Sequence, residues 1–282
     1  MYKEFLIILN NDLLVDFELL CISLNYPYKK IYENNYCKVF IHENYYKKLY
    51  IDLNELLREN LFPQEETIVI PFVNDKCSFF SWSIIIFLAI FFFFYNISRK
   101  KYLIINHGAN DAYKVINGEF YRCITSLTIH GNFSHLLSNL FFLVLLLKYI
   151  VKIFGEGIAW FMIIISGFLG NVFTSFFYQN FHSSIGFSTS NFAMIGILAN
   201  VNIKVLKSYL PAIAGFFLFI MLGGGKNVDV VAHICGFFSG LIVTEIFLKR
   251  FRFLIEKKYQ NIFKLSVTFI ILISWILAII FN

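Results

Sequence analysis

One serine and one histidine in this sequence lie near the starts of two apolar segments, and both residue types take part in nucleophilic catalysis. Ser188 follows Ile185, Gly186 and Phe187, and His233 opens the run His-Ile-Cys-Gly in a later segment. A serine hydroxyl attacks readily only when a base accepts its proton, and neutral imidazole is the usual base near pH 7. We therefore predict a dyad of Ser188 as nucleophile and His233 as general base, with Oγ and a ring nitrogen roughly 2.6–3.2 Å apart.

An earlier apolar segment carries His135 and Asn139, which are four residues apart and so share one face of a helix. When a carbonyl is attacked, negative charge develops on its oxygen, and hydrogen-bond donors must point at that oxygen. The side chains of His135 and Asn139 can supply donors, as can the backbone N–H of Ser188 at a helix N-terminus. We predict that these two residues stabilise the oxyanion.

The elements that carry these residues are membrane spans. Hydrophobic residues make up 58% of the chain, 36 residues are phenylalanine, and the mean hydropathy is +0.68. A soluble globule is only about half apolar, and a bilayer is crossed by about 20 apolar residues. We predict seven spans, the fifth of them short, at residues 79–97, 133–154, 158–177, 185–203, 210–222, 228–248 and 263–281.

The second, fourth and sixth spans run in the same direction, so their polar residues can meet. At about 1.5 Å per residue, Ser188 lies roughly 5 Å and His233 about 7–8 Å from the start of its span. His135 and Asn139 lie within the first two turns of theirs. Histidine and asparagine are costly in a bilayer unless they pair or line a water-filled cavity, so the shared depth favours one site.

Glycines are placed where these spans would have to approach each other. Gly186 precedes the serine, and Gly236 and Gly240 follow the histidine at a spacing of four residues. Small residues at this spacing let helices pack tightly in lipid. We predict that they bring the sixth span against the fourth, and that Gly167 and Gly170 do the same for the third.

Charge is distributed unevenly along the chain. Residues 1–78 hold 12 acidic and 8 basic side chains, a net charge of −4, whereas residues 79–282 hold 6 and 16, a net charge of +10. Lysine and arginine follow the second, fourth and sixth spans, which is typical of cytoplasmic loops. The pattern predicts a cytoplasmic N-terminus and an outside C-terminus, with only the cluster at residues 99–101 opposing it. Short basic clusters beside apolar runs do not indicate nucleic-acid binding.

The first 78 residues have mixed polarity and no removable signal peptide is recognised in them. Residues 38–42 and 67–70 alternate as strands do, and residues 52–60 are expected to form a helix. We predict a small α+β cytoplasmic domain over residues 1–78, whose partner is unknown. A helical core over residues 79–250 and a basic linker with a seventh helix over residues 251–282 follow it.

Metal ions and cofactors are not expected. The five cysteines are scattered without a CxxC pair, and no His-Glu-x-x-His motif is present, so neither a disulfide framework nor a zinc site is predicted.

Over residues 106–245 the chain resembles the rhomboid family of intramembrane serine proteases. The resemblance rests on Gly-x-Ser-x-x-x-Phe-Ala-x-x-Gly around Ser188, Ala-His-x-x-Gly-x-x-x-Gly around His233, His135 with Asn139, and the segments at residues 108–110 and 118–125. It implies a six-span core with an additional C-terminal helix, cleavage of transmembrane protein substrates, and Phe192 stacked on the catalytic imidazole. We expect a multi-pass protein of the bacterial plasma membrane.

Three positions depart from the family pattern. Thr189 replaces the glycine that often follows the nucleophile, and we expect it to crowd the oxyanion region. Tyr121 precedes Arg122 where tryptophan is usual, and Val151 and Lys152 stand where an acidic residue is common before Gly155. Two alternatives stay open: an inactive relative that binds membrane clients, and, less favoured, a transporter, for which the spans lack acidic residues and paired half-helices.

Overall fold

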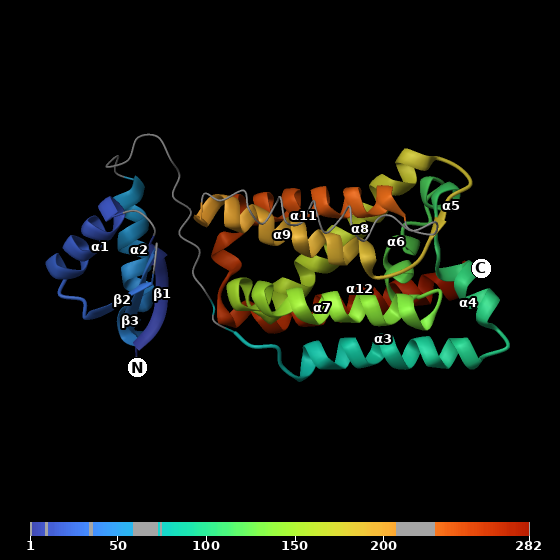
Figure 1. Ribbon diagram of the computed structural model, residues 1–282, viewed down its shortest axis with the longest axis horizontal. Coiled ribbons are helices and arrows are strands. Elements are labelled where there is room, and N and C mark those ends of the chain that lie inside the picture. The colour runs from blue at the N-terminus through green and yellow to red at the C-terminus, as the bar shows by residue number, and fades with distance from the viewer. Residues whose placement is uncertain are drawn as a thin grey trace.

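The computed structural model describes residues 2–8, 11–33, 36–58, 73, 75–206 and 229–281. It shows a small domain of strands and helices followed by a bundle of long helices (Figure 1). The predicted fold class is confirmed, because the membrane part is helical and a small α/β region precedes it. The expected strand at residues 67–70 and the expected fifth span at residues 210–222 lie outside the described residues.

The N-terminal sheet has the strand order β1-β3-β2. β3 (Tyr36–His42) runs antiparallel to both β1 (Tyr2–Ile8) and β2 (Tyr28–Glu33). Every second residue of β3 is buried, as the alternating sequence predicts, and packs against α1 (Asn11–Ser23) and α2 (Tyr46–Arg58). The core of this domain consists chiefly of Leu14, Phe17, Cys21, Cys37, Val39, Ile41, Leu49 and Leu53. The helix expected at residue 52 begins earlier, at Tyr46.

Five of the described helices are long and apolar enough to cross a membrane. They are α3 (Phe79–Ile97), α7 (Phe133–Phe154), α8 (Glu156–Tyr178), α11 (Val230–Arg250) and α12 (Gln260–Ile280). α9 (Ser188–Leu206) runs alongside them (Figure 1). The chain is therefore a multi-pass membrane protein, and the ends of these six helices differ from the predicted spans by three residues at most.

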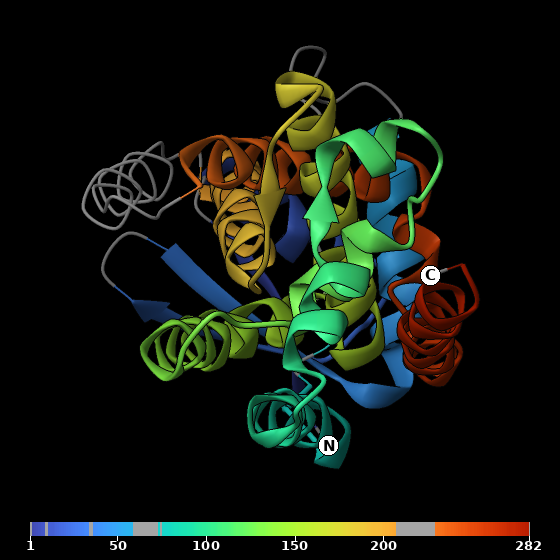
Figure 2. The same ribbon diagram turned by 90° about the vertical axis from the view of Figure 1, so that its right-hand side faces the viewer.

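The helices differ in how deeply they are buried. In α8, 67% of the most apolar stretch is buried, against 22% in α3 and 17% in α12. Viewed along the bundle, α3 and α12 lie at its rim (Figure 2). The exposed sides of α3 and α12 carry phenylalanine, isoleucine and leucine, as lipid contact requires. α8 is therefore the central helix on which the functional helices pack.

The close packing predicted from the glycines is confirmed. A methyl group placed on Gly196 of α9 would lie 2.1 Å from the Phe237 carbonyl oxygen of α11. One placed on Gly240 of α11 would lie 2.1 Å from the Ala193 carbonyl oxygen of α9. One placed on Gly170 of α8 would lie 2.9 Å from the Cα of Gly236. The backbones of α8, α9 and α11 touch, and no larger residue fits at these crossings.

The connection between α3 and α7 forms a folded cap. It contains α4 (Lys101–Gly108), α5 (Ala112–Ile116) and α6 (Arg122–Thr125), which gather at one end of the bundle (Figure 1). Within it β4 (Asn110–Asp111) pairs with β5 (Ser183–Ser184) of the loop that leads into α9. The fully buried Arg122 guanidinium donates to the Glu119 carboxylate and to backbone carbonyls of the cap.

A buried polar network closes the opposite end of the bundle. Glu156, the first residue of α8, accepts hydrogen bonds from the backbone and hydroxyl groups of Ser78 and Ser81. It also forms an ion pair with Lys264. Gln260 of α12 accepts from Gly157 N–H at 2.8 Å and donates to the Phe154 carbonyl at 3.0 Å. In the family pattern an acidic residue is common before the position of Gly155, whereas here Glu156 directly follows Gly155. The network ties α3 and α12 to α8.

Candidate active site

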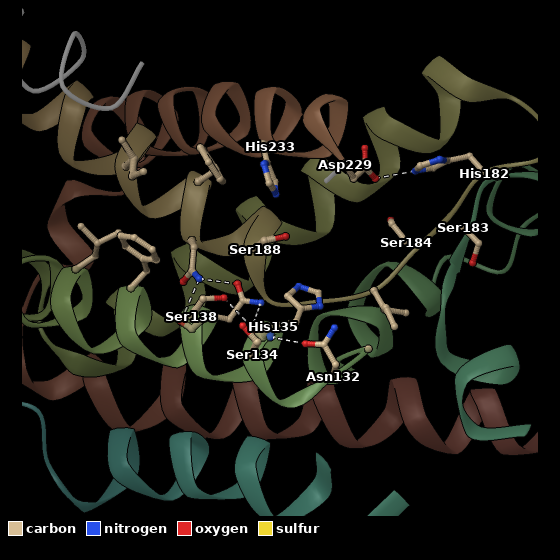
Figure 3. Close-up of a pocket in the computed structure, with 18 of the residues that line it drawn as sticks. Asn132, Ser134, His135, Ser138, His182, Ser183, Ser184, Ser188, Asp229 and His233 are labelled. Carbon is tan, nitrogen blue, oxygen red and sulfur yellow. Dashed lines mark hydrogen bonds and ion pairs between the residues drawn. The ribbon is translucent and has the colours of Figure 1, made fainter. Parts of the chain in front are cut away.

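The residues singled out from the sequence meet in one pocket at the end of the bundle that carries the cap (Figure 3). The cavity has a volume of about 740 Å³ and is lined by α7, α9, the start of α11 and the loop between α8 and α9. Ser188, His233, His135, Asn139 and Phe192 all line it. A cavity of this size accommodates several residues of an extended peptide.

The approach to Ser188 is a rigid turn. α9 begins at Ser188 itself, three residues later than predicted, so the Ser188 N–H belongs to the first turn and has no acceptor within the helix. Gly186 N–H donates to the Ser126 carbonyl at 2.9 Å, and Phe187 N–H donates to His130 Nε2 at 3.4 Å. Burial lowers the pKa of His130 to about 3, so the ring is neutral, and the hydrogen bond from Phe187 identifies Nε2 as its acceptor nitrogen.

Glycine is the only residue type that fits at position 186. Its φ of +126° lies in the region that side-chain-bearing residues avoid. A methyl group there would also lie 2.6 Å from two atoms of the His135 ring. The glycine therefore lets His135 lie directly against the backbone that leads to the serine.

His233 is oriented by stacking and not by a carboxylate. Its ring lies parallel to Phe192 of α9, with centroids 4.1 Å apart and an interplanar angle of 15°. The side chain is buried, and its Nδ1 has no hydrogen-bond partner among the described residues. Because Phe192 is one turn beyond Ser188 on the same helix, the stack aligns the imidazole with the serine.

Ser188 lies between the rings of His233 and His135 (Figure 3). Ser188 Oγ and His233 do not hydrogen bond in this structure, so the hydrogen bond predicted from the sequence is not observed. Catalytic hydrogen bonds are often long before substrate binds and shorten in the reactive complex. The arrangement brings together a serine and a histidine without the hydrogen bond that would join them.

His135 and Asn139 are held on α7 by local bonds. Asn132 caps the helix by accepting from His135 N–H at 2.8 Å. Asn139 Nδ2 donates to the His135 carbonyl at 2.9 Å, and Asn139 Oδ1 accepts from Asn191 Nδ2 at 3.0 Å. One N–H of the Asn139 amide remains for a ligand. Asn191, which the sequence analysis overlooked, fixes this amide from α9, three residues after Ser188.

Thr189 was expected to crowd the oxyanion region, but it does not. Its side chain is buried, and its methyl group points at Gly170 of α8 and Gly236 of α11. It does not line the cavity. Ser190 faces Gly167 of α8 with a buried hydroxyl, away from the cavity. Only Ser188 among the serines of this turn of α9 faces the pocket.

A second polar pair at the rim was not predicted. His182 Nε2 lies 2.7 Å from an Asp229 carboxylate oxygen (Figure 3). Burial raises the pKa of Asp229, but the hydrogen bonds from His182 and from Ala232 N–H outweigh it and hold that pKa below its usual range. The carboxylate is therefore ionised, and because it only accepts, His182 Nε2 is the donor.

Comparison with known proteins agrees with this architecture. Residues 117–250 match the rhomboid domain family. Inactive rhomboid protein 2 of Homo sapiens is 30% identical over 155 residues, which cover 51% of this chain and 17% of that protein. The mitochondrial RHOMBOID-like protein 6 of Arabidopsis thaliana is 30% identical over 149 residues, which cover 50% of this chain and 48% of that protein. RHOMBOID-like protein 4 of the same plant is 27% identical over 151 residues, or 51% of this chain and 38% of that protein.

The chain thus matches less than half the length of each of these relatives. All three relatives are eukaryotic, whereas a bacterial membrane was expected from the sequence. The membrane of origin and the orientation of the termini stay predictions.

Proposed function

We propose that the chain is an intramembrane serine protease that cleaves peptide bonds in or near transmembrane segments of membrane proteins, because its residues 117–250 match the rhomboid domain family. The observation that carries the proposal is the convergence of Ser188, His233, His135 and Asn139 on one cavity from three helices. Each of these residues is of the type that acyl transfer requires.

In the proposed reaction Ser188 Oγ attacks the carbonyl carbon of the scissile peptide bond while His233 accepts the hydroxyl proton. The tetrahedral intermediate collapses, the C–N bond breaks, and His233 returns the proton to the leaving amine. A water molecule then attacks the acyl-enzyme with His233 again as base, which frees the carboxylate and restores Ser188. Because His233 Nδ1 has no carboxylate partner in the described part of the chain, the proposed machinery is a dyad.

The oxyanion would lie between α7 and the start of α9. The Ser188 N–H, an N–H of His135 and the uncommitted N–H of Asn139 border this region. Removing one donor from such a site typically costs about 10²–10³-fold in kcat. The dipole of α9, whose first residue is Ser188, adds to the stabilisation of negative charge.

The basic ends of the spans support a cytoplasmic N-terminus, which sets the pocket toward the outer face of the membrane. Water would enter the cavity from that face. A substrate segment must present an extended peptide bond, because an intact helix keeps its carbonyls bonded and its backbone covered. Segments with helix-breaking residues near the outer surface are therefore the expected substrates.

Cleavage of a reporter protein with one transmembrane segment tests the proposal. The wild type should release a product cut at one bond, and Ser188→Ala should release none. Ser190→Ala is the matched control, because this serine is two residues away and faces α8, and it should cleave like the wild type. Equal cleavage by the wild type and Ser188→Ala would refute the assignment.

A client-binding protein without protease activity is the competing function. It is favoured by the missing hydrogen bond between Ser188 and His233. This function predicts that the wild type retains reporter proteins from detergent extracts and cleaves no member of a substrate panel. It also predicts that the wild type and Ser188→Ala bind the reporter proteins equally well. The cleavage assay separates the two functions.

A further inference from the structure

The rim of the pocket carries a hydrogen-bonded pair, His182 and Asp229, that the proposed mechanism does not use. Both side chains line the cavity, and they are 20% and 15% exposed. At this degree of burial a hydrogen bond to a carboxylate is less screened by water than one on an open surface. The pair joins the loop before α9, which carries the serine, to the residue before α11, which carries the histidine.

Asp229 organises the first turn of α11. One carboxylate oxygen accepts from Ala232 N–H at 3.0 Å, and the backbone carbonyl accepts from His233 N–H at 3.2 Å. The other carboxylate oxygen takes the hydrogen bond from His182. Asp229 thus holds the backbone of His233 through its main chain and its cap, and is itself held from outside the helix.

His182 is a fixed anchor for this carboxylate. Its ring stacks on Tyr178 at the end of α8, with centroids 3.9 Å apart and an interplanar angle of 18°. Its backbone carbonyl accepts from Ala112 N–H of the cap at 2.9 Å. The ring is therefore set by α8 and its backbone by the cap, and the pair transmits both constraints to α11.

His233 needs such a constraint. In a Ser-His-Asp triad a carboxylate on Nδ1 fixes the ring, but here Nδ1 is buried and no described residue bonds to it. Stacking on Phe192 fixes the plane of the imidazole and leaves it free to slide within that plane. The position of the first turn of α11 then determines how far the ring lies from Ser188.

We propose that His182 and Asp229 are positioning residues that hold His233 in register with Ser188. The role in catalysis rests on the proposed protease function. The pair takes the place of the missing third member of a triad, acting through the helix backbone instead of through the imidazole nitrogen.

Kinetics of single and double variants test the catalytic part. Asparagine caps helices as well as aspartate, so Asp229→Asn keeps the cap and loses the charge. His182→Ala and Asp229→Asn should each lower kcat about 10-fold and change KM little, as expected when a catalytic group is misplaced. The double variant should be no slower than either single one, because one interaction is lost in all three. His182→Gln, whose amide can donate to Asp229, should recover most of the rate.

Chemical modification of His233 tests the positioning without relying on protease activity. Diethylpyrocarbonate acylates accessible neutral imidazoles, and the modified peptide is quantified by mass spectrometry. His182→Ala and Asp229→Asn should modify His233 several-fold faster than the wild type. The control is His107→Ala, on α4 and outside the pocket lining, which should match the wild type in both assays.

Unchanged modification of His233 in both variants would overturn the proposal, whatever their rates. A loss of rate that His182→Gln does not recover would also overturn it, since a general packing defect would explain that result. If the wild type cleaves nothing while His233 still becomes more reactive in the variants, the positioning holds and the protease function fails.

Discussion

At one end of the bundle Glu156 accepts from two serines and a lysine, and Gln260 satisfies backbone groups of Phe154 and Gly157. At the other end His233 Nδ1 is buried without a partner in residues 75–206 and 229–281, and Ser188 and His233 face each other without a hydrogen bond. Both ends bury polar side chains, although these come from α3, α8 and α12 at one end and from α7, α9 and α11 at the other. The polar groups around Glu156 are hydrogen bonded to one another, whereas Ser188 and His233 keep hydrogen-bonding groups available.

The difference separates stability from chemistry. A buried carboxylate that is fully bonded resists displacement, because breaking it leaves charges without partners. A nucleophile and base with unused bonding capacity can bind a reacting group, at a cost in stability that the rest of the fold must carry. The end that contains Glu156 therefore supports the end that contains Ser188 and His233. It does so through α8, which begins at Glu156 and packs on both α9 and α11.

Removing His233 should have the largest effect on activity and little effect on stability. His233→Ala should lower kcat/KM for the reporter by about 10³-fold or more, because Ser188 loses its base. The unfolding temperature should fall only slightly, since the substitution removes the stacking on Phe192 but breaks no hydrogen bond of Nδ1 to the described residues. A large fall in unfolding temperature would contradict the contrast between the two ends.

Removing Glu156 should do the reverse. Glu156→Ala leaves Lys264 and two serines without their acceptor and should lower the free energy of unfolding by about 3–5 kcal/mol. Denaturant titration in micelles measures it, and protein that remains folded should still cleave. Glu256→Ala is the control, because that carboxylate is 44% exposed in its pair with Lys258 and should change stability by about 1 kcal/mol or less.

Gly186 lets the open end be disturbed by a single methyl group. Gly186→Ala should lower kcat about 10²-fold, because the methyl group displaces the His135 ring and the turn that aims Ser188. Gly118→Ala separates backbone strain from this displacement, since Gly118 also has a positive φ, +108°, but nothing lies within 4 Å of the added methyl. If both variants cleave equally, the contact between His135 and Gly186 is unimportant.

The Asp229 carboxylate should contribute a smaller, pH-dependent stability. Its pKa is lower in the folded chain than in the unfolded one, so the contribution is present above the unfolded pKa and is lost as pH falls through the folded value. The free energy of unfolding of the wild type should exceed that of Asp229→Asn by about 1 kcal/mol at neutral pH, and this difference should disappear below about pH 4. A difference that is constant with pH would assign the effect to packing alone.

Hydropathy predicts the long helices because lipid requires an apolar surface along each span, and α3 and α7 have the predicted ends. The start of α9 at Ser188 is not predictable in this way, since the turn at Gly186 depends on contacts with Ser126 and His130 far earlier in the chain. The cap was missed for the same reason, because its short helices are held by the buried Arg122 and not by a hydrophobic period.

The site itself was predicted in part. Ser188, His233, His135 and Asn139 share one pocket, as their depth in the spans indicated. The pairing of His182 with Asp229 has no local signal, since the two residues are 47 positions apart. Glu156 has one weak signal, an acidic residue at the start of an apolar helix, but its partners Ser78 and Lys264 come from distant segments.

The most direct measurement of the central claim is labelling by a serine-directed fluorophosphonate, which reacts with a hydroxyl only when a base activates it. The wild type should carry the label on Ser188, Ser190→Ala should label equally, and His233→Ala should not label. An unlabelled wild type, or equal labelling of the wild type and His233→Ala, would contradict activation of Ser188 by His233.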